Sequence, residues 1–177
     1  KYPQLEGKTI IGYSGGMWHV NGRDVLGVEK LLKAFKIVED RRQDIVLAIQ
    51  APRDVVRIAR KMGIKNMVYI ERTPSPNHPL RLSFLRTADI LVLTSSKYPA
   101  VYLAERSTMY QYMATSNSIL AEATLGIKGV LKHGETGYVV ELDNPEKIAE
   151  GLLELVRDEG LRKYIGKNAR SLLERYY

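Results

Sequence analysis

The stretch ERSTMYQYMATSNSILAEATLGIKGVLKHGETGYVV, residues 105–140, decides the fold class. Small hydroxyl residues typical of a helix start are followed by the apolar run SILAEA, a glycine-containing turn, and a Gly-Glu-Thr-Gly turn into GYVVEL. This pattern predicts a helix, a buried strand, a short helix and a second buried strand in succession. A helix beginning at Ser107 and Thr108 would present free backbone N–H groups and its positive dipole end to an anion such as a phosphate.

Segments typical of strands and of helices alternate along the rest of the chain. Short apolar, β-branched runs predict strands over residues 8–13, 44–50, 66–70, 88–95, 118–123 and 137–142. Amphipathic segments predict helices over residues 23–42, 52–63, 80–87, 144–158 and 160–177. Alternation at this spacing predicts an α/β fold in a single domain over residues 1–177, with a Rossmann-like parallel sheet of about six strands and helices on both faces.

Composition narrows the class of protein. The 177 residues carry 27 Lys and Arg against 20 Asp and Glu, a net charge of +7, but the two signs interleave along the helical segments. That arrangement indicates solvated helix faces, and we expect no nucleic acid partner. The basic segment 53–65 leaves open a peripheral association with an anionic membrane surface. The absence of cysteine, of a signal-peptide pattern and of a long apolar run favours a cytoplasmic location.

Ligands of open parallel sheets bind beyond the carboxyl ends of the strands. That rule selects the loops 14–23, 71–79, 95–106 and 123–127. In the first of them, SGGMWHVNGR, Gly15 and Gly16 would let the backbone approach a diphosphate, and Arg23, near the start of the next helix, would supply positive charge. Gln111 lies one turn into its helix, where it could hydrogen-bond a hydroxyl group.

Chemistry beyond binding is not visible in the sequence. The three histidines, His19, His78 and His133, have no Cys or carboxylate neighbours at metal-binding spacing. No nucleophile, base and orienting residue stand in a recognisable set. We therefore expect no metal site and no catalytic residue within this chain.

From Gly12 to about Arg175 the order of segments resembles the C-terminal, donor-binding domain of the family 4 (group 1) glycosyltransferases, which have the GT-B fold. The phrases that carry the resemblance are GVEKLLKAF (27–35), TADILVLTSS (87–96), MYQYMATSNSILA (109–121), GIKGVLKHGETGYVV (126–140) and NPEKIAEGLLELVRD (144–158). The resemblance implies one half of a GT-B enzyme, with the N-terminal acceptor domain absent. The missing initiating Met and the end at ERYY agree with the expectation of an excised domain.

The resemblance also implies an activity. A hexosyltransferase-type enzyme of this family would transfer a sugar from a UDP- or GDP-sugar to an unknown acceptor, with retention of configuration in the family's usual manner. It would need no other cofactor, and its partners would be the nucleotide sugar and its own N-terminal domain. The isolated domain would bind nucleotide and transfer nothing.

The resemblance further implies which residues contact the donor. The N–H groups at Ser107 and Thr108 would hold the diphosphate together with the Gly15–Gly16 loop, and Ile70 and Glu71 would border the base. The full expected set is Gly15, Gly16, Arg23, Ile70, Glu71, Glu105, Ser107, Thr108 and Gln111.

The chain departs from the family pattern at several of these positions. The paired glutamates of the family, eight residues apart, fall on Leu103 and Gln111, with Glu105 displaced nearby. The family's first-loop Arg and Lys fall near Gly16 and on Leu26. Two alternatives therefore stay open: another GT-B enzyme such as a nucleotide-sugar epimerase, or a non-catalytic domain that has kept the fold and lost donor binding.

Overall fold

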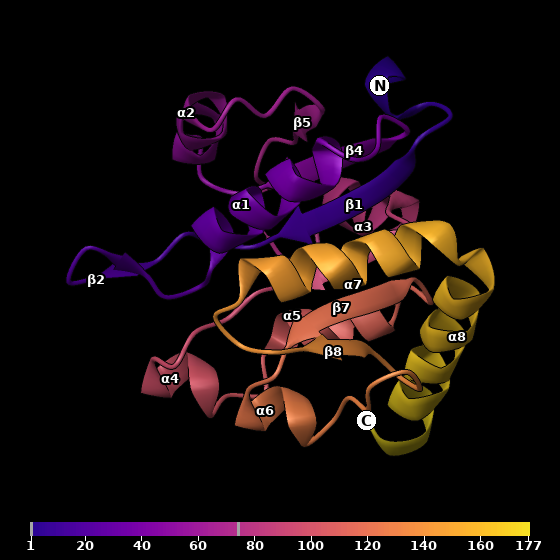
Figure 1. Ribbon diagram of the computed structural model, residues 1–177. Coiled ribbons are helices and arrows are strands. Elements are labelled where there is room, and N and C mark those ends of the chain that lie inside the picture. The colour runs from indigo at the N-terminus through magenta and orange to yellow at the C-terminus, as the bar shows by residue number, and fades with distance from the viewer. Residues whose placement is uncertain (1, 74) are drawn as a thin grey trace.

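The computed structural model describes residues 2–73 and 75–177 and contains one parallel sheet (Figure 1). Its strands are β1 (Thr9–Ser14), β4 (Ile45–Gln50), β5 (Met67–Tyr69), β6 (Ile90–Leu93), β7 (Ser118–Glu122) and β8 (Tyr138–Val140). They lie in the order β5-β4-β1-β6-β7-β8, and all neighbouring pairs are parallel. This is the doubly wound Rossmann order, in which the direction of winding reverses between β1 and β6. The strands predicted from the apolar runs are confirmed.

Helices cover both faces of this sheet. They are α1 (Val28–Glu39), α2 (Asp54–Lys61), α3 (Pro79–Thr87), α4 (Pro99–Tyr102), α5 (Ser107–Met113), α6 (Leu125–Lys128), α7 (Pro145–Arg157) and α8 (Glu159–Tyr176), with a 3-10 turn at Pro3–Leu5. In Figure 1, α1 and α7 cross the near face, α3 and α5 lie behind the sheet, and α8 runs along one end. The expected layering is therefore confirmed. The segment 95–106, expected to be irregular, contains α4 because Pro99 starts a single helical turn.

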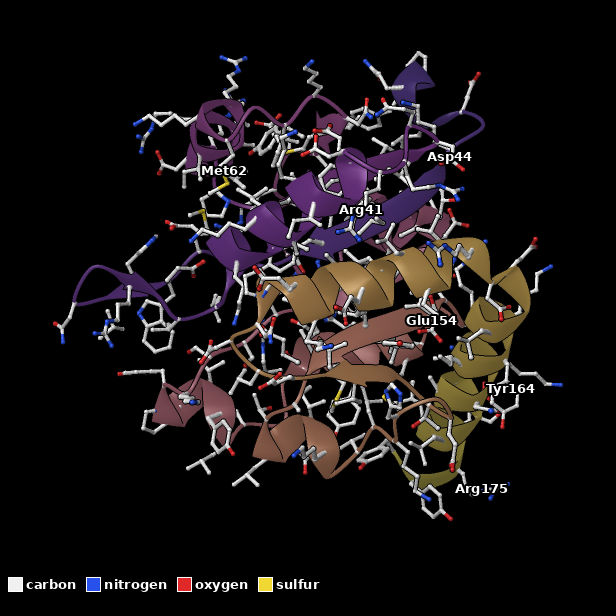
Figure 2. The ribbon with its side chains drawn as sticks, in the orientation of Figure 1. Arg41, Asp44, Met62, Glu154, Tyr164 and Arg175 are labelled. Atoms are coloured by element: carbon white, nitrogen blue, oxygen red, sulfur yellow. The ribbon has the colours of Figure 1, made fainter. Side chains whose placement is uncertain are left out.

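Two apolar clusters fill the spaces between these layers. One joins α1 and α7 to the sheet and includes Phe35 and Leu152, and the other joins α3 and α5 to the opposite face and includes Phe84 and Met113. Outside the core, Glu154 on α7 and Tyr164 on α8 reach solvent (Figure 2). The β-branched strands are thus buried on both sides, as parallel strands require.

The segment before α1 differs from the expected helix over 23–42. Residues 19–24 form an antiparallel hairpin of β2 (His19–Val20) and β3 (Arg23–Asp24), which projects from the sheet (Figure 1). Its turn residues Asn21 and Gly22 have φ values of 49° and 73°, the left-handed geometry that an Asn-Gly hairpin turn adopts. The helical prediction for Arg23 was wrong because this turn signal outweighs the helical periodicity that follows it.

Asp24 connects the hairpin to α1. Its carboxylate accepts hydrogen bonds from the backbone N–H groups of Leu26, Gly27 and Glu29 at 3.0, 3.2 and 2.9 Å. Gly27, the residue before the helix, provides no side-chain cap of its own. Asp24 therefore does the capping work for α1 from outside the helix.

We expect Asp24→Ala to lower the free energy of unfolding by about 1–2 kcal/mol, because three backbone donors lose their acceptor. Urea unfolding followed by circular dichroism measures the change. Asp54→Ala, which removes an exposed acid from the first turn of α2, is the matched control and should cost about 0.5 kcal/mol or less. Equal effects of the two variants would contradict the capping role.

Candidate functional site

A cavity of about 230 Å³ opens at the carboxyl ends of β1 and β4. Its walls come from residues 14–16, from the β5–α3 loop, and from Gln50, Arg81 and Thr108. We call it the β1 cavity. It lies beside the point where the winding of the sheet reverses, where ligands of such folds bind. Among its described lining residues the charged side chains are Arg72 and Arg81, and the others are hydroxyl, amide, glycine or proline residues.

A buried arginine stands in the wall of the β1 cavity. Arg81 on α3 is 8% exposed, and its Nε donates to Ser14 Oγ at 2.9 Å while its Nη1 donates to the Pro76 carbonyl at 2.8 Å. Ser14 Oγ in turn donates to Gln50 Oε1 at 2.9 Å. Burial lowers the pKa of Arg81, but a guanidinium stays protonated in proteins. The network therefore holds a fixed cation at the end of β1.

Two buried phenols shape the glycine loop that follows β1. The Tyr112 hydroxyl accepts the N–H of Ser14 at 2.9 Å, and the Tyr13 hydroxyl donates to the Gly16 carbonyl at 3.0 Å. A Cβ on Gly15 would lie 2.7 Å from the Tyr13 hydroxyl, so this position excludes a side chain. Burial raises the pKa of both phenols, which keeps them neutral and able to donate. Two hydrogen bonds with buried phenols thus fix the loop backbone that lines the cavity.

The start of α5 also borders this cavity. Thr108 lines it, while Ser107 is exposed next to it. The residue preceding the helix, Arg106, provides no side-chain cap and donates from Nη1 to the Thr94 carbonyl at 2.6 Å. The structure therefore brings together Gly15, Gly16 and Thr108 of the expected donor contacts.

Two further expected residues of α5 and its approach lie away from the cavity wall. The Glu105 carboxylate accepts a hydrogen bond from the Tyr110 hydroxyl on the surface. Gln111 is partly buried and does not line the β1 cavity. On α5 it is Thr108, and neither Glu105 before the helix nor Gln111, that lines the cavity.

Ile70 and Glu71 precede the loop that closes one side of the β1 cavity. Ile70 is buried, and its N–H donates to the Ile49 carbonyl at 2.8 Å. The Glu71 carbonyl accepts from Gln50 Nε2 at 2.9 Å, and its exposed carboxylate pairs with Arg53 at 3.0 Å. Both residues border the site, and the first side chain of this loop to line the cavity is that of Arg72.

Arg23 lies in a different place. A second cavity, of about 730 Å³, is lined by the hairpin and by the segment leading into α4, and Arg23, Lys97 and Tyr98 contribute to it. We call it the hairpin cavity. Trp18 contacts the Tyr98 ring edge-on, with centroids 5.2 Å apart. Arg23 belongs to the same loop as Gly15 and Gly16, but the hairpin places it at a different cavity. It therefore does not line the cavity that Thr108 lines.

A buried ion pair fixes the neighbouring strand ends. Glu122, at the end of β7, is fully buried, and its carboxylate lies 2.7 Å from Lys30 Nζ of α1. It also accepts the N–H groups of Ser95 and Asp143, each at 2.8 Å. Burial raises the pKa of the Glu122 carboxyl, and the Lys30 ammonium opposes that shift. The pair ties the loops after β6 and β8 to α1.

Sequence reasoning missed Ser14, Gln50, Arg81, Lys30 and Glu122. Three of them, Ser14, Gln50 and Glu122, are the last residues of their strands. A polar residue closing an apolar run is therefore the signal that could have found them. Arg81 stands in PLRLSFLR, where nothing distinguishes it from a surface arginine.

Two kinds of feature are absent from the described residues. They hold no group of three or more acidic or histidine side chains able to share a metal ion. Within residues 2–73 and 75–177, no helix combines the length and the apolar character that a bilayer crossing demands.

Comparison with known proteins places this geometry in a family. The family model described as glycosyl transferases group 1 matches residues 21–172. CapM of Staphylococcus aureus, a capsular polysaccharide biosynthesis glycosyltransferase, is 24% identical over 176 residues, which are 96% of this chain and 42% of that protein. The chain spans about two fifths of the length of the curated relatives it matches, with 37% and 42% for two of them.

Solved structures show the same fold. The C-terminal domain of the group 1 glycosyl transferase LpcC from Francisella tularensis has a TM-score of 0.78 at 23% identity, covering 97% of this chain and 87% of that one. HepE of Anabaena, solved with UDP and glucose, has a TM-score of 0.78 at 11% identity, covering 98% of this chain and 45% of that one. The fold is that of one half of a GT-B enzyme, and with the family model matching residues 21–172, the chain belongs to the group 1 glycosyl transferases.

Proposed function

We propose that this chain is the donor-binding domain of a glycosyltransferase that transfers a sugar from a nucleoside-diphosphate sugar to an acceptor. The observation that carries the proposal is the β1 cavity, a cationic, hydroxyl-rich cavity at the carboxyl edge of the sheet in a member of this family. Its walls offer hydrogen-bond donors and no carboxylate among the described lining residues, which suits an anionic group of the donor.

The expected contacts divide into two groups around this cavity. Gly15, Gly16 and Thr108 line it and would meet the phosphates, with the exposed Ser107 beside them. Ile70, Glu71, Glu105 and Gln111 do not line the cavity and would serve the base, the ribose and the sugar, while Arg23 lies at the hairpin cavity. Electrostatic stabilisation of the departing nucleoside diphosphate is then the chemical contribution of this domain.

The remaining features of the enzyme follow the same proposal. The donor would be a UDP- or GDP-sugar, and transfer would retain the anomeric configuration. An N-terminal domain would bind the acceptor across the cleft, which agrees with the greater length of the relatives. Peripheral association with a membrane would use the basic surface around α2, where Arg53, Arg57 and Arg60 are exposed.

A second candidate is a non-catalytic domain that has lost donor binding. The observation in its favour is that Leu103 and Gln111 stand where the resembling family has its paired glutamates, and that the Leu103 side chain is 62% exposed. A domain of this kind would keep the β1 cavity and show no nucleotide affinity.

A nucleotide screen separates the two candidates. We expect one of UDP, GDP and ADP, each at millimolar concentration, to raise the melting temperature of the chain. A ligand at 100 times its Kd stabilises a protein by about 2.7 kcal/mol. Isothermal calorimetry then gives the Kd, with adenosine and uridine as controls that lack phosphate. No stabilisation by any of the three diphosphates, here or with an N-terminal domain joined to the chain, would favour the non-catalytic alternative.

A further inference from the structure

The β1 cavity contains a buried positive charge for which the described residues supply no negative partner. Arg81 is 8% exposed, and both of its hydrogen-bond acceptors, Ser14 Oγ and the Pro76 carbonyl, are neutral. None of the ion pairs among the described residues includes Arg81. Taking a charge out of water without a counter-charge costs several kcal/mol. A ligand that carries negative charge would offset this cost.

The geometry of Arg81 suits an anionic ligand in this cavity. A guanidinium has five N–H donors in a planar fork, and two neutral acceptors hold it in one orientation. Ser14 is itself oriented by its hydrogen bond to Gln50, so the acceptor of Arg81 Nε is held in place by a second side chain. Arg72, which is exposed, lines the same cavity from the β5–α3 loop. Two arginines therefore converge on one space.

The first loop contributes no charge to this space. Residues 14–18 are Ser-Gly-Gly-Met-Trp, and the hairpin carries Arg23 into the hairpin cavity. Within the lining of the β1 cavity that the structure describes, positive charge comes from helix α3 and the loop before it. The glycine backbone beside Ser14 leaves room for an anion to approach both arginines.

We propose that Arg81 and Arg72 bind the diphosphate of the donor in the β1 cavity, so that α3 and its preceding loop supply the charge that the first loop lacks. This inference rests on the proposed function and identifies the residues that carry its electrostatics. The ligand class is a pyrophosphate group, and the recognition is by the planar forks of two arginines.

Calorimetry with three probes tests the assignment: inorganic pyrophosphate, UDP and uridine, or the diphosphate and nucleoside preferred in the screen. We expect Arg72→Ala and Arg81→Lys each to weaken pyrophosphate and UDP binding by about tenfold or more, the effect of losing a charged hydrogen bond. Uridine binding should not change. Arg86→Ala, which removes an exposed arginine of α3 that does not line the cavity, is the matched control and should bind all three probes as the parent does.

The other possible results of these measurements also decide whether Arg72 and Arg81 bind the diphosphate. Parental affinity of both variants for pyrophosphate, or no pyrophosphate binding by the parent, overturns the proposal. If Arg23→Ala lost UDP affinity while Arg72→Ala and Arg81→Lys kept it, the diphosphate would be assigned to the hairpin cavity. That result would also overturn the proposal. Should Arg81→Lys fail to fold by circular dichroism, exposed Arg72 decides alone. Pyrophosphate binding that depends on these arginines, without binding of any nucleoside diphosphate, would sustain the anion site and refute the proposed function.

Discussion

Lys30→Met is expected to lower the free energy of unfolding by about 3–5 kcal/mol, the cost of removing one partner of a buried ion pair. Lys30 Nζ lies 2.7 Å from the Glu122 carboxylate, whose side chain is fully buried, and it also contacts Asp143 at 2.8 Å. Without the ammonium, the carboxylate keeps two backbone N–H donors but no counter-charge. Urea unfolding measures the loss, and Lys33→Met, on the exposed side of the same helix, is the control expected to cost about 0.5 kcal/mol or less.

The pH dependence of this variant distinguishes lost charge compensation from lost packing. Burial already raises the pKa of Glu122, and removal of Lys30 takes away the largest influence that lowers it. A carboxyl group whose folded pKa exceeds its unfolded value of about 4.3 destabilises the protein increasingly as pH rises through the folded pKa. The difference between Lys30→Met and the parent should therefore be smaller near about pH 5 than near about pH 8.

A double variant checks the same interpretation. Lys30→Met with Glu122→Gln removes the buried charge and keeps an amide oxygen for one of the two N–H groups. We expect this pair to recover at least about 1 kcal/mol relative to Lys30→Met alone, because contacting residues are coupled. A pH-independent loss of unfolding free energy, with no recovery in the double variant, would contradict this interpretation. It would show that Lys30 stabilises the fold through the packing of its side chain alone.

Gly126→Ala is the second change with a large expected effect. A Cβ on Gly126 would lie 2.0 Å from the carbonyl oxygen of Ala104 and 2.9 Å from the Glu105 nitrogen. Both are backbone atoms of the segment 103–106 between α4 and α5, so either α6 or this segment must shift. We expect a loss of about 3 kcal/mol, at the upper end for overpacking, although alanine normally stabilises a helix by about 1 kcal/mol over glycine.

Gly129→Ala is the matched control for that variant. It lies one turn further along, and the nearest atom to its Cβ would be the Leu125 carbonyl oxygen at 3.5 Å, an ordinary contact. We expect it to be neutral or stabilising by up to about 1 kcal/mol in thermal and urea unfolding. Equal stability of the two variants would mean that the link before α5 yields easily, and the position of Thr108 would then not depend on α6.

The strands and most helices could be predicted from local pattern alone. Runs such as DIVLAIQ and ADILVLTS are apolar throughout because strands buried on both faces need apolar side chains at every position. Periodicity predicted that the helix begins at Arg23, whereas α1 begins at Val28. The start is later because an Asn-Gly turn precedes it and the carboxylate of Asp24 caps the helix from outside. At that point the conformational preference of the Asn21-Gly22 turn determined the structure, and the apolar periodicity did not.

The candidate site divides in the same way. That Gly15, Gly16 and Thr108 line one cavity could be predicted, because a glycine loop after the first strand and a helix start after the fourth meet at one sheet edge in this topology. Arg81 was not found, because an arginine in a short amphipathic helix gives no sign of whether it faces solvent or a cavity. Its hydrogen-bond partner in the cavity wall, Ser14, is 67 residues away in the chain.

By itself, the sequence determined the alternation of elements, the doubly wound class of the sheet and the edge at which a ligand would bind. These depend on side-chain polarity and turn residues that act within a few positions of one another. Only the tertiary structure decided which charges share a space: Arg72 and Arg81 at the β1 cavity, Arg23 at the hairpin cavity, and Lys30 against Glu122. The physical reason is that burial and ion pairing depend on distances across the fold, which the order of residues along the chain does not reveal.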